Sequence, residues 1–280
     1  SSAKSYAIDI QHIVLKKVQT EWKSDSLVKM NATVSVSLGA INLDSPNQVL
    51  KSLKHSFRYL NGSVDKLTVK GDSAFYTVST NHIAFDSRNQ LIMIDSFTLA
   101  PNYGKYEFAN VLGKQSDRME LSIDKIVVEG LDFFGLLDST VSVRKISTYS
   151  ANLHAFRDKR VPFRNTSVVS MPMAAFKKLP FVISIDSVAI HNSLITVEEF
   201  SPDGFRPGHI SFKELTASMV GLKNRHKFKE PKYSKLNVSA KVMGSGQIQA
   251  VFQFPLDESP IYSASGVVSK LPLKDLNPIL

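Results

Sequence analysis

The residues able to do acid–base or metal chemistry are scattered along the chain. The seven histidines stand alone, with no His-x-x-x-His pair and no carboxylates at the spacing of a local metal site. Glu198 and Glu199 are adjacent, but neighbouring residues of a strand point to opposite faces, so they make a poor acid–base pair. Cysteine is absent, which excludes thiolate metal sites, a cysteine nucleophile and disulfides. We therefore predict a protein that is not an enzyme and has no catalytic residues, metal site or cofactor.

The short glycine and aspartate motifs favour structural roles. Gly244-Ser245-Gly246 does not match the Gly-x-Ser-x-Gly pattern of a nucleophile elbow and is interpreted as a bulge or bend. The sequence has no glycine loop of the phosphate-binding type. Single Asp residues recur between apolar residues, without the dense Asp/Asn/Gly loop that binds calcium. Hydrogen bonding at the start of strands is the preferred interpretation of these aspartates.

Two loop-like stretches, 157–171 and 222–233, concentrate positive charge in a chain with a net charge of +9. Docking on an anionic membrane surface and simple solubility are both open interpretations of these stretches. Nucleic acid is not expected as a partner, because Phe228 and Tyr233 alone do not make a stacking platform. The candidate contacts to an anionic surface are Lys223, Arg225, Lys227 and Lys229.

The 17 phenylalanines are spread along the whole chain. In a closed sandwich they would form the core, whereas in an open, trough-like sheet they would line a long apolar surface suited to acyl chains. The sequence leaves both alternatives open. The candidate groove-lining residues are Phe97, Phe212, Phe252 and Phe254.

The elements that must position these residues are strands, because the dominant period of hydrophobicity is two. From Met30 to Leu38 every second residue is apolar, with Asn, Thr or Ser between them, which predicts a half-buried strand. The same alternation recurs at 67–69, 98–100, 236–242 and 247–254. We predict a mainly β fold, an elongated and partly open antiparallel β-groove or a stack of strand pairs.

One phrase recurs: an apolar residue, Asp, any residue, then an apolar residue. The two apolar residues of this phrase are three positions apart, whereas residues on one face of a regular strand are an even number of positions apart. The alternation therefore changes near the Asp, which indicates a bulge or a strand start. The copies suggest repeated short strand units that bury their apolar faces against their neighbours. They are Val64-Asp65-Lys66-Leu67, Ile94-Asp95-Ser96-Phe97, Ile123-Asp124-Lys125-Ile126 and Ile185-Asp186-Ser187-Val188, with a weaker copy at Val143-Arg144-Lys145-Ile146.

Few helices are expected, and they are short. Ser45-Pro46 predicts a helix start, and helical spacing continues to Leu60 before Asn61-Gly62 ends it. Three shorter candidates are 106–112, 133–137 and 173–179. Such helices would cap the ends of the sheet or cover an edge.

We expect residues 1–280 to form one continuous β-rich segment of a longer protein, with a seam near 157–180. An all-β domain of this length is common. The sequence lacks an initiator Met and ends on the apolar residues Ile279-Leu280, which suggests a fragment. It has no apolar run near the ~18–20 residues of a spanning helix and no signal peptide.

From Ser122 onward the order of these patterns resembles the AsmA-like (DUF748-containing) envelope proteins of bacteria with two membranes. The earlier stretch from Ile94 to Met119 shows the same kind of strand pattern. The segments that carry the resemblance are Ser122–Asp132, Leu136-Leu137, Phe156–Pro162, Met171–Pro180, Ile185–Glu199, Gly208–Phe212 and Leu276–Leu280.

This resemblance implies a periplasmic protein, anchored in the inner membrane by an N-terminal helix that this segment lacks. It also implies a β-groove with an apolar interior that serves lipid transport or outer-membrane homeostasis, without a catalytic motif. We therefore predict a non-enzymatic lipid-binding or lipid-transfer groove whose partners are phospholipid acyl chains and an anionic membrane surface. The alternative is a structural or adhesion-type β module that binds protein partners or anionic surfaces.

Overall fold

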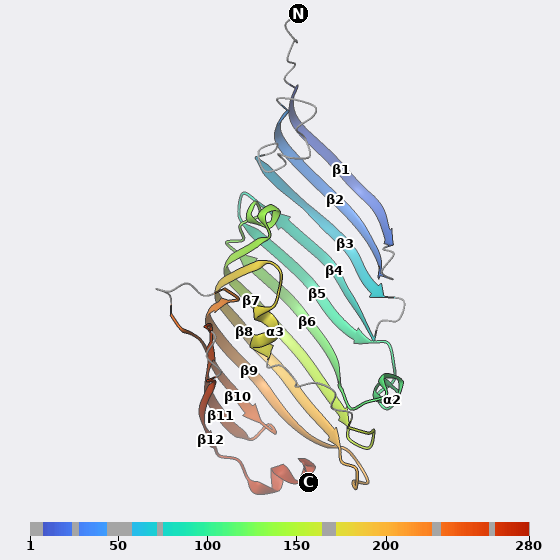
Figure 1. Ribbon diagram of the computed structural model, residues 1–280, viewed down its shortest axis with the longest axis vertical. Helices are drawn as coiled ribbons and strands as arrows, with labels where there is room; N and C mark the ends of the chain where they lie inside the picture. The colour runs from blue at the N-terminus through green and yellow to red at the C-terminus, as the bar shows by residue number, and fades with distance from the viewer. Residues whose placement is uncertain are drawn as a thin grey trace, which may run out of the picture.

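The computed structural model describes residues 8–23, 28–43, 58–71, 75–163, 172–225, 231–257 and 261–279. These residues form one twelve-stranded sheet in which the strands follow one another in sequence order (Figure 1). Strands make up 68% of the chain and helices 9%, which confirms the predicted mainly β, open architecture with a few short helices. The sheet is elongated, with β1 at one end and β12 at the other.

The strands are long for a globular protein, and several exceed fifteen residues. Their bounds are β1 Ile8–Lys23, β2 Val28–Leu43, β3 Tyr59–Gly71, β4 Tyr76–Asp86, β5 Leu91–Pro101, β6 Asp117–Glu129, β7 Thr140–Asp158, β8 Val182–Phe200, β9 Gly208–Lys223, β10 Tyr233–Val242, β11 Gly246–Pro255 and β12 Ser263–Ser269.

All neighbouring strands are antiparallel except β7 and β8, which run parallel in one register from Thr140↔Val182 to Asp158↔Phe200. A parallel pair needs a crossover connection. The crossover occupies the region around 157–180 in which the sequence suggests a seam, and the sheet continues on both sides of it.

The short helices lie at the two ends of the strands. The predicted helices at 106–112, 133–137 and 173–179 correspond to α2 (Glu107–Leu112), the 3-10 helix η2 (Gly135–Asp138) and α3 (Pro172–Lys177). A second 3-10 helix, η3 (Leu273–Ile279), follows β12. Gly113 ends α2 in the left-handed conformation, with φ 71°.

Two local predictions differ from the structure. Leu60, Asn61 and Gly62 belong to β3 and do not end a helix, because they pair with Leu38, Ser37 and Val36 of β2. The rest of that predicted helix, from Ser45, lies outside the described residues. Gly244 and Ser245 form the turn between β10 and β11, with φ 82° at Gly244, and do not lie within one strand.

A line of residues in the left-handed conformation crosses the middle of the sheet and keeps one face apolar. In the regular strand β2, Met30 and Val34 are four residues apart and share a face, yet their partners in β3, Val69 and Val64, are five apart. The extra residue is accommodated at Lys66, where φ is 52°. The members of this line are Lys17, Lys66, Ser96, Ser150, Asn192 and Glu214, with φ from 46° to 56°.

The repeated Asp phrase marks this line. Lys66 and Ser96 each stand directly after the Asp in two of the copies, which confirms the bulge that the parity change predicts. The copy at Ile123 lies beside Ser150 on the neighbouring strand, since Ile123 pairs with Ala151. The copy at Ile185 pairs instead with the weaker copy at Val143.

Among the described residues, no helix is long and apolar enough to cross a membrane.

Candidate functional site

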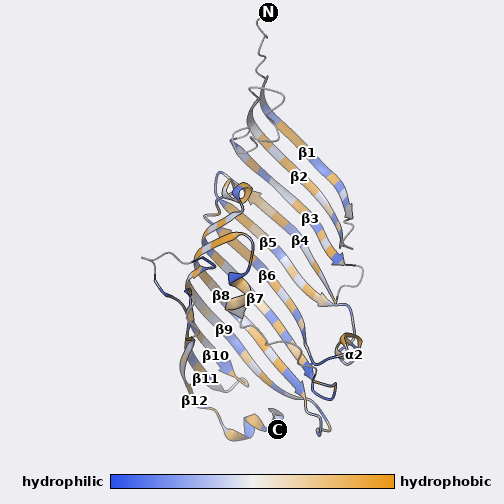
Figure 2. Ribbon diagram, in the orientation of Figure 1, coloured by the Kyte–Doolittle hydropathy of each residue, from blue (hydrophilic) through white to orange (hydrophobic). Residues whose placement is uncertain are grey.

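One face of the sheet, here called the apolar face, carries hydrophobic side chains across all twelve strands. Directly paired residues of neighbouring strands share a face, so the register traces rows of side chains. Figure 2 shows the alternation of hydrophobic and hydrophilic residues along the strands that produces these rows. One complete row runs Val18–Val34–Val64–Ile83–Ile94–Ile126–Thr148–Ile190–Ala217–Val238–Ala250–Gly266. A second runs Leu15–Val36–Gly62–Phe85–Ile92–Val128–Ile146–Val188–Met219–Leu236–Phe252–Ala264.

The opposite face is mostly polar. A row on this face runs Val14–Ser37–Asn61–Asp86–Leu91–Glu129–Lys145–Ser187–Val220–Lys235–Gln253–Ser263. Hydroxyl groups also pair across strands here, as in the 2.6 Å hydrogen bond between Ser79 and Thr98. Only Val14, Leu91 and Val220 are apolar in this row, so the two faces differ in chemistry on most of the strands.

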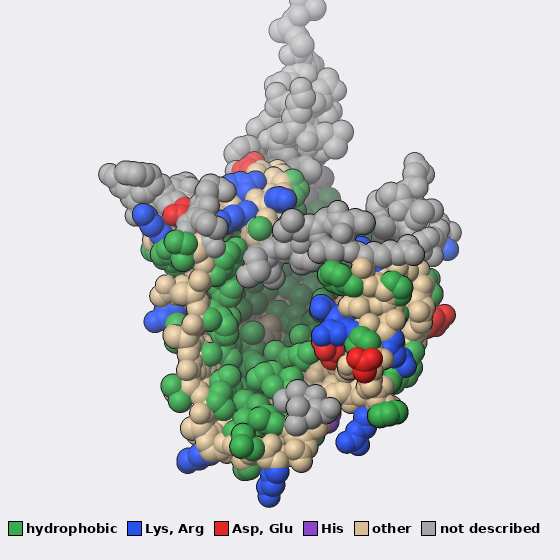
Figure 3. All heavy atoms as spheres, turned by 60° about the horizontal axis from the view of Figure 1, so that its bottom comes forward, with side chains coloured by type: hydrophobic (Ala, Val, Ile, Leu, Met, Phe, Trp, Pro, Cys, Tyr) green, Lys and Arg blue, Asp and Glu red, His purple; other side chains and the backbone are tan. Residues whose placement is uncertain are grey.

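Among the residues that the structure describes, no second layer of elements covers the full length of the apolar face. In both complete rows every side chain is at least partly exposed, whereas a sheet that packs on a second layer buries its apolar side chains. Figure 3 shows the consequence, a hollow lined by hydrophobic side chains that opens at one end of the molecule between two walls. A continuous apolar surface of this extent marks an interaction or ligand-binding surface.

The four phenylalanines proposed from the sequence as groove-lining all lie on the apolar face. Phe97 pairs with Ile123, Phe212 with Ile195, and Phe252 with Leu236. Phe254 follows two residues after Phe252 on the same face, and their rings stack at 6.4 Å. All four are half-buried. Aliphatic residues nevertheless make up most of the apolar face. The alternation of apolar and polar residues in the sequence is the pattern that predicts their position on one face.

At one end of the strands, α3 covers the apolar face. Leu131, Val143, Ile183 and Ile185 form a buried cluster there, against which Phe176 and Leu179 pack. Here the apolar face is buried, as it also is at Val242, which pairs with Phe212 and is 3% exposed.

The basic residues proposed as anion contacts lie at this α3 end. The Arg225 guanidinium donates to the carbonyl oxygens of Lys177 and Leu179, so it fastens α3 to the end of β9. Lys223 ends β9 and also has an interaction partner. Lys227 and Lys229 lie outside the described residues. The role of Arg225 in this structure is to hold α3 in place.

At the other end of the strands, here called the α2 end, aromatic rings and ion pairs fasten the β5–β6 connection to β7 and β8. The Tyr106 ring contacts Phe156 edge-on at 5.5 Å, and the Arg160 guanidinium lies 3.6 Å from the centre of the Phe200 ring. Phe156 is only 1% exposed. Lys105 crosses to Glu198 at 2.6 Å.

The carboxylates of this cluster are held in the ionised form. Two hydrogen bonds from the Arg160 guanidinium to Asp158, at 2.9 and 2.7 Å, lower the pKa of that carboxyl. Burial acts to raise the pKa of Glu198, but hydrogen bonds from Lys105 and His154 outweigh it and lower the pKa. Because each acid is matched by a base, the cluster is a structural clamp and does not present free charge to a ligand.

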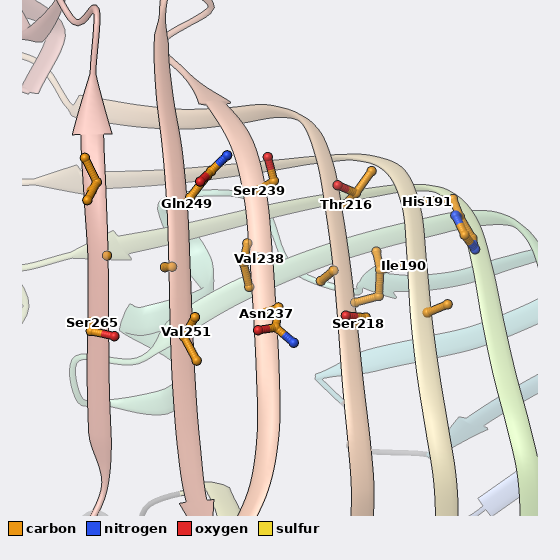
Figure 4. A pocket seen from close by; sticks show the side chains of 15 residues that line it. Ile190, His191, Thr216, Ser218, Asn237, Val238, Ser239, Gln249, Val251 and Ser265 are labelled. Carbon is orange, nitrogen blue, oxygen red and sulfur yellow. The ribbon is translucent and has the colours of Figure 1, made fainter.

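A shallow hollow of about 750 Å³ crosses β8 to β12. Figure 4 shows one row of its lining, His191, Thr216, Ser239 and Gln249, beside a second row, Ser218, Asn237, Val251 and Ser265. Ile190, Val238 and their apolar-face neighbours lie between these rows. The only titratable side chain in the lining is His191, whose ring stacks on Tyr149 at 4.8 Å. Because neighbouring residues of a strand point to opposite faces, the side chains of these two rows lie on the face opposite to Ile190 and Val238.

Within the part of the chain that the structure describes, no group of three or more His, Asp or Glu side chains could hold a metal ion. Among the described residues, the imidazole–carboxylate pair with the shortest distance is His82 with Asp65, at 2.5 Å on the polar face.

No protein-family model matches this chain, and a comparison with curated proteins finds no match either. The functional interpretation therefore depends on the geometry of the apolar face and on the sequence patterns.

Proposed function

We propose that this protein is a non-enzymatic lipid-binding or lipid-transfer β-groove whose apolar face holds phospholipid acyl chains. The observation that carries the proposal is the row from Val18 to Gly266, which crosses twelve strands without a charged side chain and stays partly exposed throughout. Leaving so much apolar surface in water is unfavourable, at about 25 cal/mol per Å². A ligand that covers the face recovers this free energy.

The size and chemistry of the face suit acyl chains. Neighbouring strands lie about 4.8 Å apart, so twelve strands extend on the order of 50 Å. One leaflet of the hydrocarbon core of a bilayer is about 15 Å thick, so the face has room for several chains in succession. Each methylene group buried contributes about 0.8 kcal/mol, which provides affinity without specific polar contacts.

The cellular setting is part of the same proposal and rests on the resemblance to AsmA-like envelope proteins. We propose that the protein acts in the periplasm, anchored in the inner membrane by an N-terminal helix, where it supports outer-membrane homeostasis.

Two neighbouring residues of β6 provide a matched test of the proposal. Ile126 lies on the apolar face and Val127 on the opposite face, and both are half-buried. We expect Ile126→Asp to weaken binding of a dansyl-labelled fatty acid by at least about tenfold, since a carboxylate in the acyl path must be desolvated. Val127→Asp should bind the probe like the wild-type protein.

Lipid extraction and native mass spectrometry of the purified wild-type protein should show co-purifying phospholipid. Equal probe binding by the two variants, or a wild-type protein that repeatedly carries no lipid, would overturn the proposal. Urea unfolding of both variants separates loss of binding from loss of folding.

The free edges of the sheet favour a second candidate function, a structural or adhesion-type module. Within the described residues, β1 and β12 each pair with one strand only. All seven residues of β12 are exposed and none is charged. An uncharged edge strand is a template for pairing with another strand. This function predicts protein association through β12 and no lipid dependence.

A further inference from the structure

We propose that the α2 end of the sheet carries a membrane-docking rim that places the open mouth of the groove against a lipid bilayer. The rim is defined as residues 159–163, residues 201–207 and the segment 270–279 that contains η3. The docking can be tested whether or not the groove binds acyl chains, although its purpose rests on the proposed function.

The rim presents the most exposed aromatic side chains of the described chain. Phe205 is 103% exposed and Phe163 is 68% exposed, while Leu273 of η3 reaches 81%. The two phenylalanines stand in loops that leave adjacent strands at the same end, because Asp158 of β7 pairs with Phe200 of β8. Isolated apolar tips that point into water fit a bilayer interface, where they enter the boundary between headgroups and acyl chains.

The loop around Phe205 is built to hold the ring outward. Pro202 and Pro207 restrict the backbone on both sides, and the Gly204 amide donates to the Ser201 carbonyl at 3.2 Å. A restricted loop loses little conformational entropy on binding. Pro162 precedes Phe163 in the same manner.

Basic residues stand close in sequence to two of these tips, Phe205 and Leu273. Arg206 follows Phe205 directly, Lys274 follows Leu273, and Lys270 precedes Leu273 by three residues. Among the described residues none of these three makes an ion pair, so they are available to phosphate groups. The acidic residues of the rim are Asp203 and Asp275, and Asp275 is engaged by the Ser245 hydroxyl.

The position of the rim fits the groove. Figure 3 is turned so that this end comes forward, and the hydrophobic hollow opens there. In Figure 1 the loops after β7 and β8 and the helix η3 lie together at the bottom of the molecule, away from α3. A bilayer that receives Phe163 and Phe205 would lie next to this opening.

Vesicle co-sedimentation tests the rim directly. We expect the wild-type protein to bind phosphatidylcholine vesicles and to bind phosphatidylcholine/phosphatidylglycerol vesicles severalfold more tightly, with the difference reduced by salt. The double variant Phe163→Ser/Phe205→Ser should lose about tenfold or more of its vesicle partitioning, because both apolar anchors are removed.

Two controls make the outcome specific. Val267→Ser/Ile261→Ser removes hydrophobic side chains of 69% and 64% exposure outside the rim, and it should bind vesicles like the wild-type protein. The dansyl fatty acid probe should bind the Phe163→Ser/Phe205→Ser variant normally, whereas Ile126→Asp should lose the probe and keep vesicle binding. The two measurements thereby distinguish failure of the docking proposal from failure of the acyl-chain-binding proposal. Absence of wild-type vesicle binding, or equal loss in the Val267→Ser/Ile261→Ser control, would overturn the docking proposal.

Discussion

At the scale of single residues, the charged side chains near the α2 end stabilise the fold. Asp158 is 2% exposed and accepts two hydrogen bonds from the Arg160 guanidinium, which also lies over the Phe200 ring. A buried carboxylate that loses its charge leaves the guanidinium without a partner of equal strength. We expect Asp158→Asn to lower the free energy of unfolding by about 1–3 kcal/mol, measured by urea denaturation at neutral pH.

The same pair gives a pH dependence with a defined sign. The pKa of the Asp158 carboxyl is lower in the folded protein than in the unfolded chain, where it is about 3.9. The ionised carboxylate therefore contributes fully to stability at pH values above the unfolded-state pKa. This contribution is lost as the pH falls through the folded-state pKa. The stability difference between wild-type protein and Asp158→Asn should therefore shrink below about pH 4. A constant difference down to pH 2 would show that the carboxylate charge is not the cause.

At the scale of elements, the line of left-handed residues keeps the apolar face continuous. Ser96 has φ 56° in the middle of β5, a conformation that a β-branched side chain strongly disfavours. We expect Ser96→Ile to destabilise the protein by about 1–2 kcal/mol and Ser96→Gly to be neutral or stabilising. Thermal unfolding would measure both.

Ser122 of β6 is the matched control for this element. It lies in the neighbouring strand, is exposed and is not among the residues with positive φ. Ser122→Ile should leave the melting temperature nearly unchanged, because isoleucine favours an ordinary strand conformation. Equal destabilisation at both positions would argue against backbone conformation as the cause.

At the scale of the whole molecule, the sheet ends in two edges. Val267 of β12 is 69% exposed on a strand that carries no charge. If this edge pairs with other chains, Val267→Lys should weaken the concentration-dependent association of the protein severalfold in analytical ultracentrifugation, since a lysine on an edge strand opposes pairing. Val220→Lys, on an exposed position inside the sheet, should leave association unchanged.

The sequence predicts much of this architecture because period-two hydrophobicity is a local signal. The strand from Met30 to Leu38 lies within β2, and the parity change at Val64 and Leu67 coincides with the left-handed Lys66. The errors in the predicted elements arise where a local sequence pattern competes with pairing between strands. Asn61-Gly62 resembles a helix stop, but pairing with β2 places both residues in β3.

The sequence by itself determined a mainly β chain with an apolar set and a polar set of side chains on its strands. Only the tertiary structure decided that, in the described part of the chain, the apolar set stays partly exposed, because covering it depends on whether a second layer of elements packs there. It also decided the roles of Arg225 and Phe205. One fastens α3 and the other points into water, and this difference arises from contacts between segments distant in sequence.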